Sequence, residues 1–186
     1  ALPIYFWPAC AKIVNLIDKF LIELKQLNFP VKDYLIVSSG PLAIRDIREC
    51  GDLDILISDR LFDDLSKIHT VEIGEHVSKI SFENIECMHR NFVQDDKYNF
   101  VYQRANAEII NGIPFQDLKT CLFFKEKSER EKDKKDVELI KKYFLDNGIL
   151  PSRIEVRGQG SAFPIFDNDT KEHYELNTRI EVYFLN

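Results

Sequence analysis

Two aspartates spaced two residues apart could hold a metal ion. Asp52 and Asp54 stand in the segment GDLDILIS, at the start of an apolar run. Alternate side chains of a strand point to the same face, so both carboxylates would project together while Leu53 and Ile55 point into a core. Like charges on one face are tolerated where a divalent cation lies between them, and magnesium suits such oxygen ligands together with nucleotide phosphates. The spacing therefore predicts a magnesium site, with a solvated strand end as the alternative.

Small residues precede this pair. The apolar run LIV, expected to be a strand, ends at Ser38, Ser39 and Gly40. Small side chains let backbone N–H groups approach a phosphate closely. We expect these three residues to contact phosphate, followed by a short helix from Pro41 to Arg48 and a strand from Leu53 to Ile57.

The same segment resembles the opening of minimal nucleotidyltransferases of the DNA polymerase beta superfamily. In that pattern a Gly-Ser pair ends one strand, a helix follows, and an Asp-x-Asp motif lies on the next strand. The chain has Ser38-Ser39 at the Gly-Ser position, then Gly40, and later Asp52 and Asp54. The resemblance implies an α/β fold, in which a mixed-sheet nucleotidyltransferase-like core is flanked by helices. It also implies a third carboxylate on a strand beside the Asp-x-Asp strand.

The third carboxylate is expected within the segment from Val77 to Met88, which we predict to be one strand. Glu86, which stands between two apolar residues, is the first candidate, and Glu83 is the second. By the resemblance, this residue would complete the magnesium ligation or act as a base. An ordinary solvated glutamate is the alternative for either position.

A late charged segment carries a second part of the resemblance. Relatives have a lysine followed by Gly-Arg-x-Lys-Asp-x-x-Asp on a late helix, and a glutamate replaces the glycine here. The matching residues are Lys125, Arg130, Lys132, Asp133 and Asp136. The resemblance implies that Lys125 and Arg130 face a triphosphate, where fixed cations offset developing charge, and that Lys132 also binds nucleotide. Alternating charges at i, i+3 and i, i+4 describe an ordinary solvated helix face equally well.

The composition limits the fold class and the partners. The chain has 186 residues, 45% of them hydrophobic, and a formal net charge of −6 at pH 7. Such a chain can bury a core, and its acidic balance argues against nucleic acid as a partner. No apolar run is long enough to span a bilayer, so no membrane span is expected. The four cysteines are widely spread along the chain, which argues against a zinc site. Free buried thiols are expected, with a disulfide as the alternative.

Hydrophobic spacing predicts the remaining elements. Helices are expected at residues 11–27, 60–68, 104–111 and 134–147.

The end of the chain resembles a different class of protein. The segments Gly158-Gln159-Gly160, Asn168-Asp169-Thr170 and Asn177-Thr178-Arg179 follow the order and spacing of the last part of an OmpA-like peptidoglycan-binding domain. Strands are expected at residues 153–156 and 179–185. This resemblance implies a C-terminal β tail like the end of an OmpA-like α/β sandwich.

The two resemblances together predict a nucleotidyltransferase-like domain at residues 1–147 and an OmpA-like segment at residues 148–186, which share the helix at 134–147. The longer match predicts magnesium-dependent binding of ATP or another nucleoside triphosphate in the cytoplasm. A nucleotidyl group would pass to a hydroxyl of an acceptor protein or small molecule. One alternative is a noncatalytic periplasmic or envelope protein that binds peptidoglycan through residues 148–186. Another is a catalytically dead nucleotidyltransferase fold used for interaction.

Overall fold

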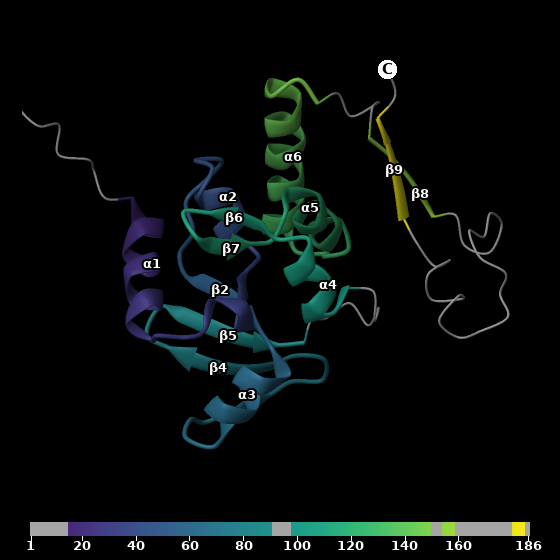
Figure 1. Cartoon of the computed structure of the whole chain (residues 1–186). Helices are drawn as coiled ribbons and strands as arrows, with labels where there is room; N and C mark the ends of the chain where they lie inside the picture. Colours follow the sequence, from purple (N-terminus) through teal and green to yellow (C-terminus); the bar gives the residue numbers. More distant parts are fainter. Residues whose placement is uncertain (1–14, 91–97, 150–153, 159–179, 185–186) are drawn as a thin grey trace, which may run out of the picture. The chain divides into compact units, whose positions relative to one another are not determined.

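The computed structural model describes residues 15–90, 98–149, 154–158 and 180–184 (Figure 1). The chain divides into two units, residues 1–133 and 134–186, and each is described by itself. The predicted domain boundary at residue 147 stays a prediction.

A seven-stranded mixed sheet forms the body of the first unit, in the order β3-β4-β5-β2-β1-β7-β6 (Figure 1). β2 lies near its centre, antiparallel to β1 and parallel to β5, and β1 runs parallel to β7. The strands are β1 (Tyr34–Ile36), β2 (Leu53–Ile57), β3 (Glu72–Ile73), β4 (Ser78–Phe82), β5 (Ile85–His89), β6 (Glu108–Ile110) and β7 (Ile113–Phe115). The mixed α/β sheet flanked by helices, predicted from the sequence, is therefore confirmed.

Helices connect and cover these strands, and polar side chains define several of their starts. Ser58, Asn99 and Asp117 each accept a hydrogen bond from a backbone N–H in the first turn of the following helix, as N-caps do. The helices are α1 (Leu16–Gln26), α2 (Gly40–Ala43), α3 (Asp59–Ser66), α4 (Phe100–Ala105), α5 (Leu118–Glu126) and α6 (Glu131–Asp146), with a 3₁₀ turn at Val31–Asp33. Of the predicted helix at 11–27, residues 11–14 lie outside the described part.

The two faces of the sheet are set by alternation along β2. Its odd-numbered residues, Leu53, Ile55 and Ile57, are buried in a large apolar cluster that also takes side chains from α1 and α3. Leu56 belongs instead to a smaller cluster with residues of β1. Because alternate residues point to opposite faces, Asp54 shares the face of Leu56 and not that of the main core.

In the second unit, β8 (Ile154–Gly158) and β9 (Ile180–Phe184) pair antiparallel, with Val156 opposite Val182. Both fall where the sequence predicts strands. The other predicted OmpA-like segments, from Gln159 to Arg179, lie outside the described residues. The OmpA-like character of this part therefore stays a prediction.

The single strand predicted from Val77 to Met88 is wrong, because the segment folds into a hairpin. Phe82 pairs with Ile85, so Glu83 and Asn84 form the turn between β4 and β5. The Asn84 side chain donates hydrogen bonds to the carboxylate of Glu23 on α1, at 3.0 and 3.1 Å. These bonds fix the turn against that helix, and they leave the second candidate, Glu83, exposed in a turn and not on a strand.

The helix predicted at residues 104–111 is also wrong. α4 ends at Ala105, and Glu108–Ile110 forms β6, which pairs with β7. Asn111 and Gly112 connect these strands with φ values of 52° and 78°. Positive φ at both positions is the requirement of a type I′ hairpin turn, for which Asn-Gly is the preferred pair. The dipeptide was therefore the signal that the helical periodicity obscured.

The short helix predicted from Pro41 to Arg48 ends earlier, at Ala43. Asp46 has a φ of 54°, in the left-handed region, and a right-handed helix cannot continue through such a residue.

Candidate functional site

The predicted carboxylates come together on the central strands. Asp54 lies on β2, and Asp52 lies just before that strand. Glu86 of the parallel strand β5 stands directly opposite Asp54 in the register. Neighbouring strands are about 4.8 Å apart, so two side chains in register on the same face lie within reach of one ion. The structure thus brings Asp54 and Glu86 together as predicted, with Asp52 exposed at the start of the strand.

The electrostatics of Asp54 reflect this grouping. Burial raises the pKa of its carboxyl group, and a hydrogen bond from the Ser38 side chain opposes that rise. The charges of Asp52 and Glu86 raise the same pKa further, whereas Lys79 lowers it. The like charges of these two carboxylates therefore disfavour the ionised form of Asp54.

Sequence reasoning missed Lys79. Its Nζ atom donates to Oε2 of Glu86 at 2.5 Å, and the two side chains are 38% and 34% exposed. In the β4–β5 register Ser81 is opposite Glu86, and Lys79, two residues earlier, shares that face. The alternation of Lys79 with buried Ile80 was visible in the sequence, but a single long strand gave no reason to bring Lys79 and Glu86 together.

The turn after β1 contains the serines predicted to contact phosphate. Ser38 has a φ of 60°, in the left-handed region where glycine is favoured, and this is where the resembled family has its Gly-Ser pair. The backbone N–H of Val37 donates to the carbonyl oxygen of Asp54 at 3.0 Å, which ties the turn to the carboxylates. Ser39, the next residue, is buried.

Gly40 has a packing role. A Cβ atom on this residue would lie 2.3 Å from Cγ2 of Ile36, so no larger side chain fits without displacement. Its backbone N–H donates to the carbonyl oxygen of Val37 at 3.2 Å and is engaged within the turn. Gly40 therefore shapes the turn, and phosphate contact by Ser38 and Ser39 stays a prediction.

The cations predicted to face a triphosphate form a separate cluster around Asp133. Nζ of Lys125 donates to Asp133 Oδ1 at 3.1 Å, and Oδ2 of Asp133 accepts from Ser128 Oγ and Arg130 Nε, each at 2.6 Å. Asp133 is 1% exposed and Lys125 is 5% exposed. Lys132 is exposed at the start of α6 and has no part in these bonds.

This cluster changes the ionisation of Asp133. Burial alone would raise the pKa of its carboxyl group, but hydrogen bonds from Ser128, Lys125 and Arg130 and the charge of Lys125 hold that pKa below its usual range. One turn before Lys125 on α5, Sγ of Cys121 donates to the carbonyl oxygen of Ser38 at 3.3 Å. Residues four apart share a helix face, so the Lys125 side of α5 is the side that contacts the serine turn.

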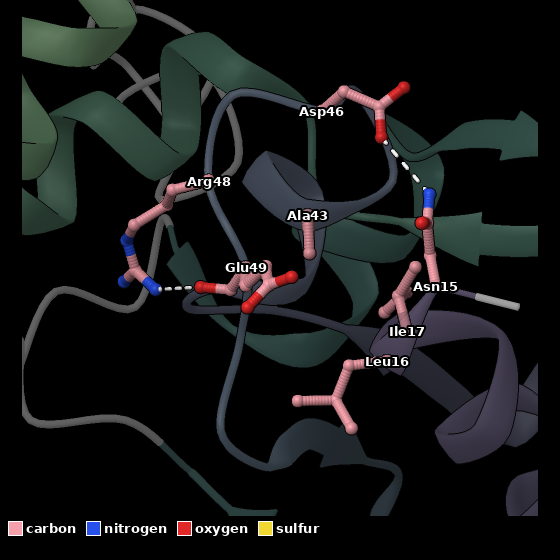
Figure 2. Close-up of a pocket in the computed structure, with 7 residues that line it drawn as sticks. All are labelled: Asn15, Leu16, Ile17, Ala43, Asp46, Arg48 and Glu49. Atoms are coloured by element: carbon pink, nitrogen blue, oxygen red, sulfur yellow. Dashed lines mark hydrogen bonds between the residues drawn. The ribbon is translucent and has the colours of Figure 1, made fainter. Parts of the chain in front are cut away.

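A pocket of about 160 Å³ in the first unit lies elsewhere (Figure 2). Figure 2 shows Asn15 reaching Asp46 across it, with Nδ2 and Oδ1 3.3 Å apart, and Arg48 bonded to the Glu49 carbonyl oxygen. Ligand pockets are commonly about 300 to 1,000 Å³, so this one is small for a nucleoside triphosphate. It contains none of the predicted site residues.

Thiol chemistry has no support among the described residues. Cys50, Cys87 and Cys121 are buried and form no disulfide, as expected, while Cys10 lies outside the described part. Burial raises the pKa of Cys87 to about 12 and also raises that of Cys50. A nucleophilic cysteine needs the opposite shift.

Two kinds of feature are absent from the described residues. No group of three or more His, Cys, Asp or Glu side chains has the arrangement of a metal site there. No helix within those ranges is both long and apolar enough to cross a membrane. The donor set of Asp52, Asp54 and Glu86 still consists of the hard oxygen atoms that magnesium prefers, although Glu86 faces Lys79 in this structure.

Comparisons with known proteins give no match. No family model, no curated protein and no solved structure matches the chain.

Proposed function

We propose that the chain binds magnesium and a nucleoside triphosphate at Asp52, Asp54 and Glu86, and transfers a nucleotidyl group to a hydroxyl of an acceptor protein or small molecule. The observation that carries the proposal is the register of Asp54 opposite Glu86 on parallel strands, beside the turn at Ser38. Nucleoside triphosphates are cytoplasmic, so the proposal also places the chain in the cytoplasm.

Each residue has a defined part in this reaction. Asp52 and Asp54 would hold the metal, which when bound supplies Lewis acidity and aligns the attacking oxygen with the leaving group. Ser38 and Ser39, with Gly40 shaping the turn, would contact the phosphates. The acceptor oxygen would attack the α-phosphorus, and the bond to the β-phosphate oxygen would break to release pyrophosphate. Glu86 would take the proton from the acceptor hydroxyl.

The basic residues divide by exposure. The side chain of Arg130 is 58% exposed, and Lys132 is exposed as well, so both retain surface that a phosphate can reach. The side chain of Lys125 is only 6% exposed and lies against Asp133. We therefore assign phosphate contact to Arg130 and Lys132, and we assign Lys125 to ordering α5 beside the serine turn.

Calorimetric titration with magnesium ATP, followed by magnesium GTP, tests the nucleotide site. The wild-type chain is expected to bind one of them, and Asp52→Asn and Asp54→Asn are expected to lose at least about tenfold in affinity, because each removes a charged ligand. Asp63→Asn, an exposed position on α3, is the matched control and should bind like the wild type. Equal binding by all four proteins would overturn the metal assignment.

A fold that binds nucleotide without turning it over is the second candidate. The contact of Lys79 with Glu86 favours it, because the Glu86 oxygen that would take the acceptor proton already accepts a hydrogen bond from Lys79. Release of pyrophosphate separates the two candidates. Binding with release supports the transferase, and binding without release, across a panel of hydroxyl acceptors, supports the inactive fold.

A further inference from the structure

The carboxylate group has a lysine already in contact with it. Lys79 Nζ lies 2.5 Å from Glu86 Oε2, and the charge of Lys79 also acts on Asp54. We infer that Lys79 is a built-in counter-ion of this group, and that a divalent cation binds to the carboxylates in competition with it. The inference rests on the proposed metal site and goes beyond it, since it names the residue that sets the affinity of that site.

The register places Lys79 where it can play this part. β5 lies between β2 and β4, so Glu86 has Asp54 on one side and the Lys79 strand on the other. Lys79 and Glu86 occupy the same sheet face in a diagonal relation, two residues apart across the β4–β5 pair. Side chains in this relation are within reach when one of them is as long as lysine.

Charge favours exchange over permanent pairing. Among the described residues, the charges that act on Asp54 are those of Asp52, Glu86 and Lys79, so one ammonium group stands beside three carboxylates and a divalent ion would reduce the excess of negative charge. A magnesium or manganese ion near Glu86 would repel the Lys79 ammonium group, which then has to leave the carboxylate. In the structure, the Glu86 oxygen that a metal would bind accepts from Lys79 instead.

The exposure of Lys79 allows it to leave. Its side chain is 38% exposed, and a lysine stem can turn its ammonium group into water while its carbons stay on the sheet. The contrast is Lys125, whose side chain is 6% exposed and could not be released without breaking a buried ion pair with Asp133. Lys79 is therefore suited to an exchange that Lys125 is not.

Titration with manganese chloride alone, followed by electron paramagnetic resonance of the free ion, tests this inference without nucleotide. Manganese takes the same oxygen ligands as magnesium. Lys79→Gln is expected to bind manganese about three- to tenfold more tightly than the wild type, because the competing cation is gone. Lys79→Arg should stay near the wild-type affinity, and Lys67→Gln, which removes an exposed lysine paired with Asp64, is the matched control.

The outcomes separate this inference from the proposed function. Tighter binding by Lys79→Gln, with loss of binding in Asp54→Asn, supports both. Unchanged or weaker binding by Lys79→Gln, with loss in Asp54→Asn, overturns the counter-ion and leaves the metal site intact. Absence of binding by both the wild type and Lys79→Gln overturns the metal site and the inference together.

Discussion

Two lysine–carboxylate pairs in the first unit differ in how completely they are satisfied. Lys125 and Asp133 are 6% and 2% exposed in their side chains, and Asp133 also accepts from Ser128 and Arg130. Lys79 and Glu86 are 38% and 34% exposed, and further carboxylates stand beside them. The Lys125–Asp133 pair is buried, and we call it the closed pair. The Lys79–Glu86 pair is partly exposed and lies beside Asp52 and Asp54, and we call these four residues the open site.

The ionisation of the two aspartates shows what this difference means. Burial acts first on both Asp133 and Asp54, and it raises the pKa of each. Three donors reverse the shift at Asp133, so the fold favours its charged form. At Asp54 the neighbouring carboxylates add to the rise, so the fold disfavours its charged form. An aspartate whose ionised form the fold stabilises contributes to stability. An aspartate whose ionised form the fold destabilises is a candidate for ligand binding.

Asp133→Asn is expected to have the largest effect on stability. It breaks the buried ion pair of Asp133 with Lys125, and the loss of one member of a buried pair typically costs about 3 kcal/mol in the free energy of unfolding. The pKa of Asp133 is lowered, so its contribution is present above the unfolded value of about 3.8 and is lost as pH falls toward the folded value. Urea unfolding at pH 7 and at acid pH measures both effects.

The double variant Lys125→Met with Asp133→Asn controls for the unpaired charge. It removes both charges of the closed pair and should recover much of the loss, because the cost of a broken buried pair is mainly the charge left behind. A single Asp133→Asn variant as stable as the wild type would show that the closed pair does not order the fold.

The positions of Asp54 and Glu86 could be predicted from the sequence, whereas the pairing of Lys125 with Asp133 could not. β2 has the predicted bounds from Leu53 to Ile57, and the placement of Asp54 on a strand follows from alternation alone. Glu86 as its neighbour came from the resemblance, and the register places it opposite Asp54. Short-range periodicity was sufficient here because the two aspartates are separated by a single residue.

The rest depends on pairings between distant residues. Lys79 meets Glu86 only because a two-residue turn folds β4 back onto β5, and Asn84 in that turn bonds to Glu23, 61 positions away. The resemblance implied that Lys125 contacts a phosphate. In the structure its ammonium group donates instead to Asp133, in the first turn of α6. Hydrophobic periodicity predicts which face of a strand or helix a residue occupies. It does not predict which distant residue will contact it there.

Substitutions of Ser38, which lies beside Asp54, should have the next largest effect on stability. Its φ of 60° is costly for a residue with a Cβ atom, and its side-chain hydrogen bond to Asp54 offsets part of that cost. Ser38→Ala keeps the conformational cost and loses the hydrogen bond, so it should be about 1 kcal/mol less stable than the wild type. Ser38→Gly loses the same bond but relieves the backbone, so thermal unfolding should place it near the wild type. Equal stability of the two variants would show that the turn relaxes when its side chain changes.

Asp54→Asn should have the smallest effect on stability and the opposite sign to Asp133→Asn. The fold raises the pKa of Asp54, so the ionised group opposes folding at neutral pH, and its neutral isostere should gain on the order of 0.5 kcal/mol there. As pH falls through the raised folded pKa toward the unfolded value of about 3.8, the wild type binds its proton in the folded state first and gains stability. The stability advantage of Asp54→Asn over the wild type should therefore shrink as the pH falls. The stability deficit of Asp133→Asn should shrink only below the pKa of an aspartate in the unfolded chain.

The free energies of unfolding of both variants between pH 3 and pH 7 would measure this, with Asp63→Asn as the exposed control. An Asp54→Asn variant that is less stable than the wild type at pH 7 would mean that Lys79 and Ser38 stabilise the ionised form of Asp54. Asp54 would then resemble Asp133, whose ionised form is stabilised by its hydrogen-bond donors.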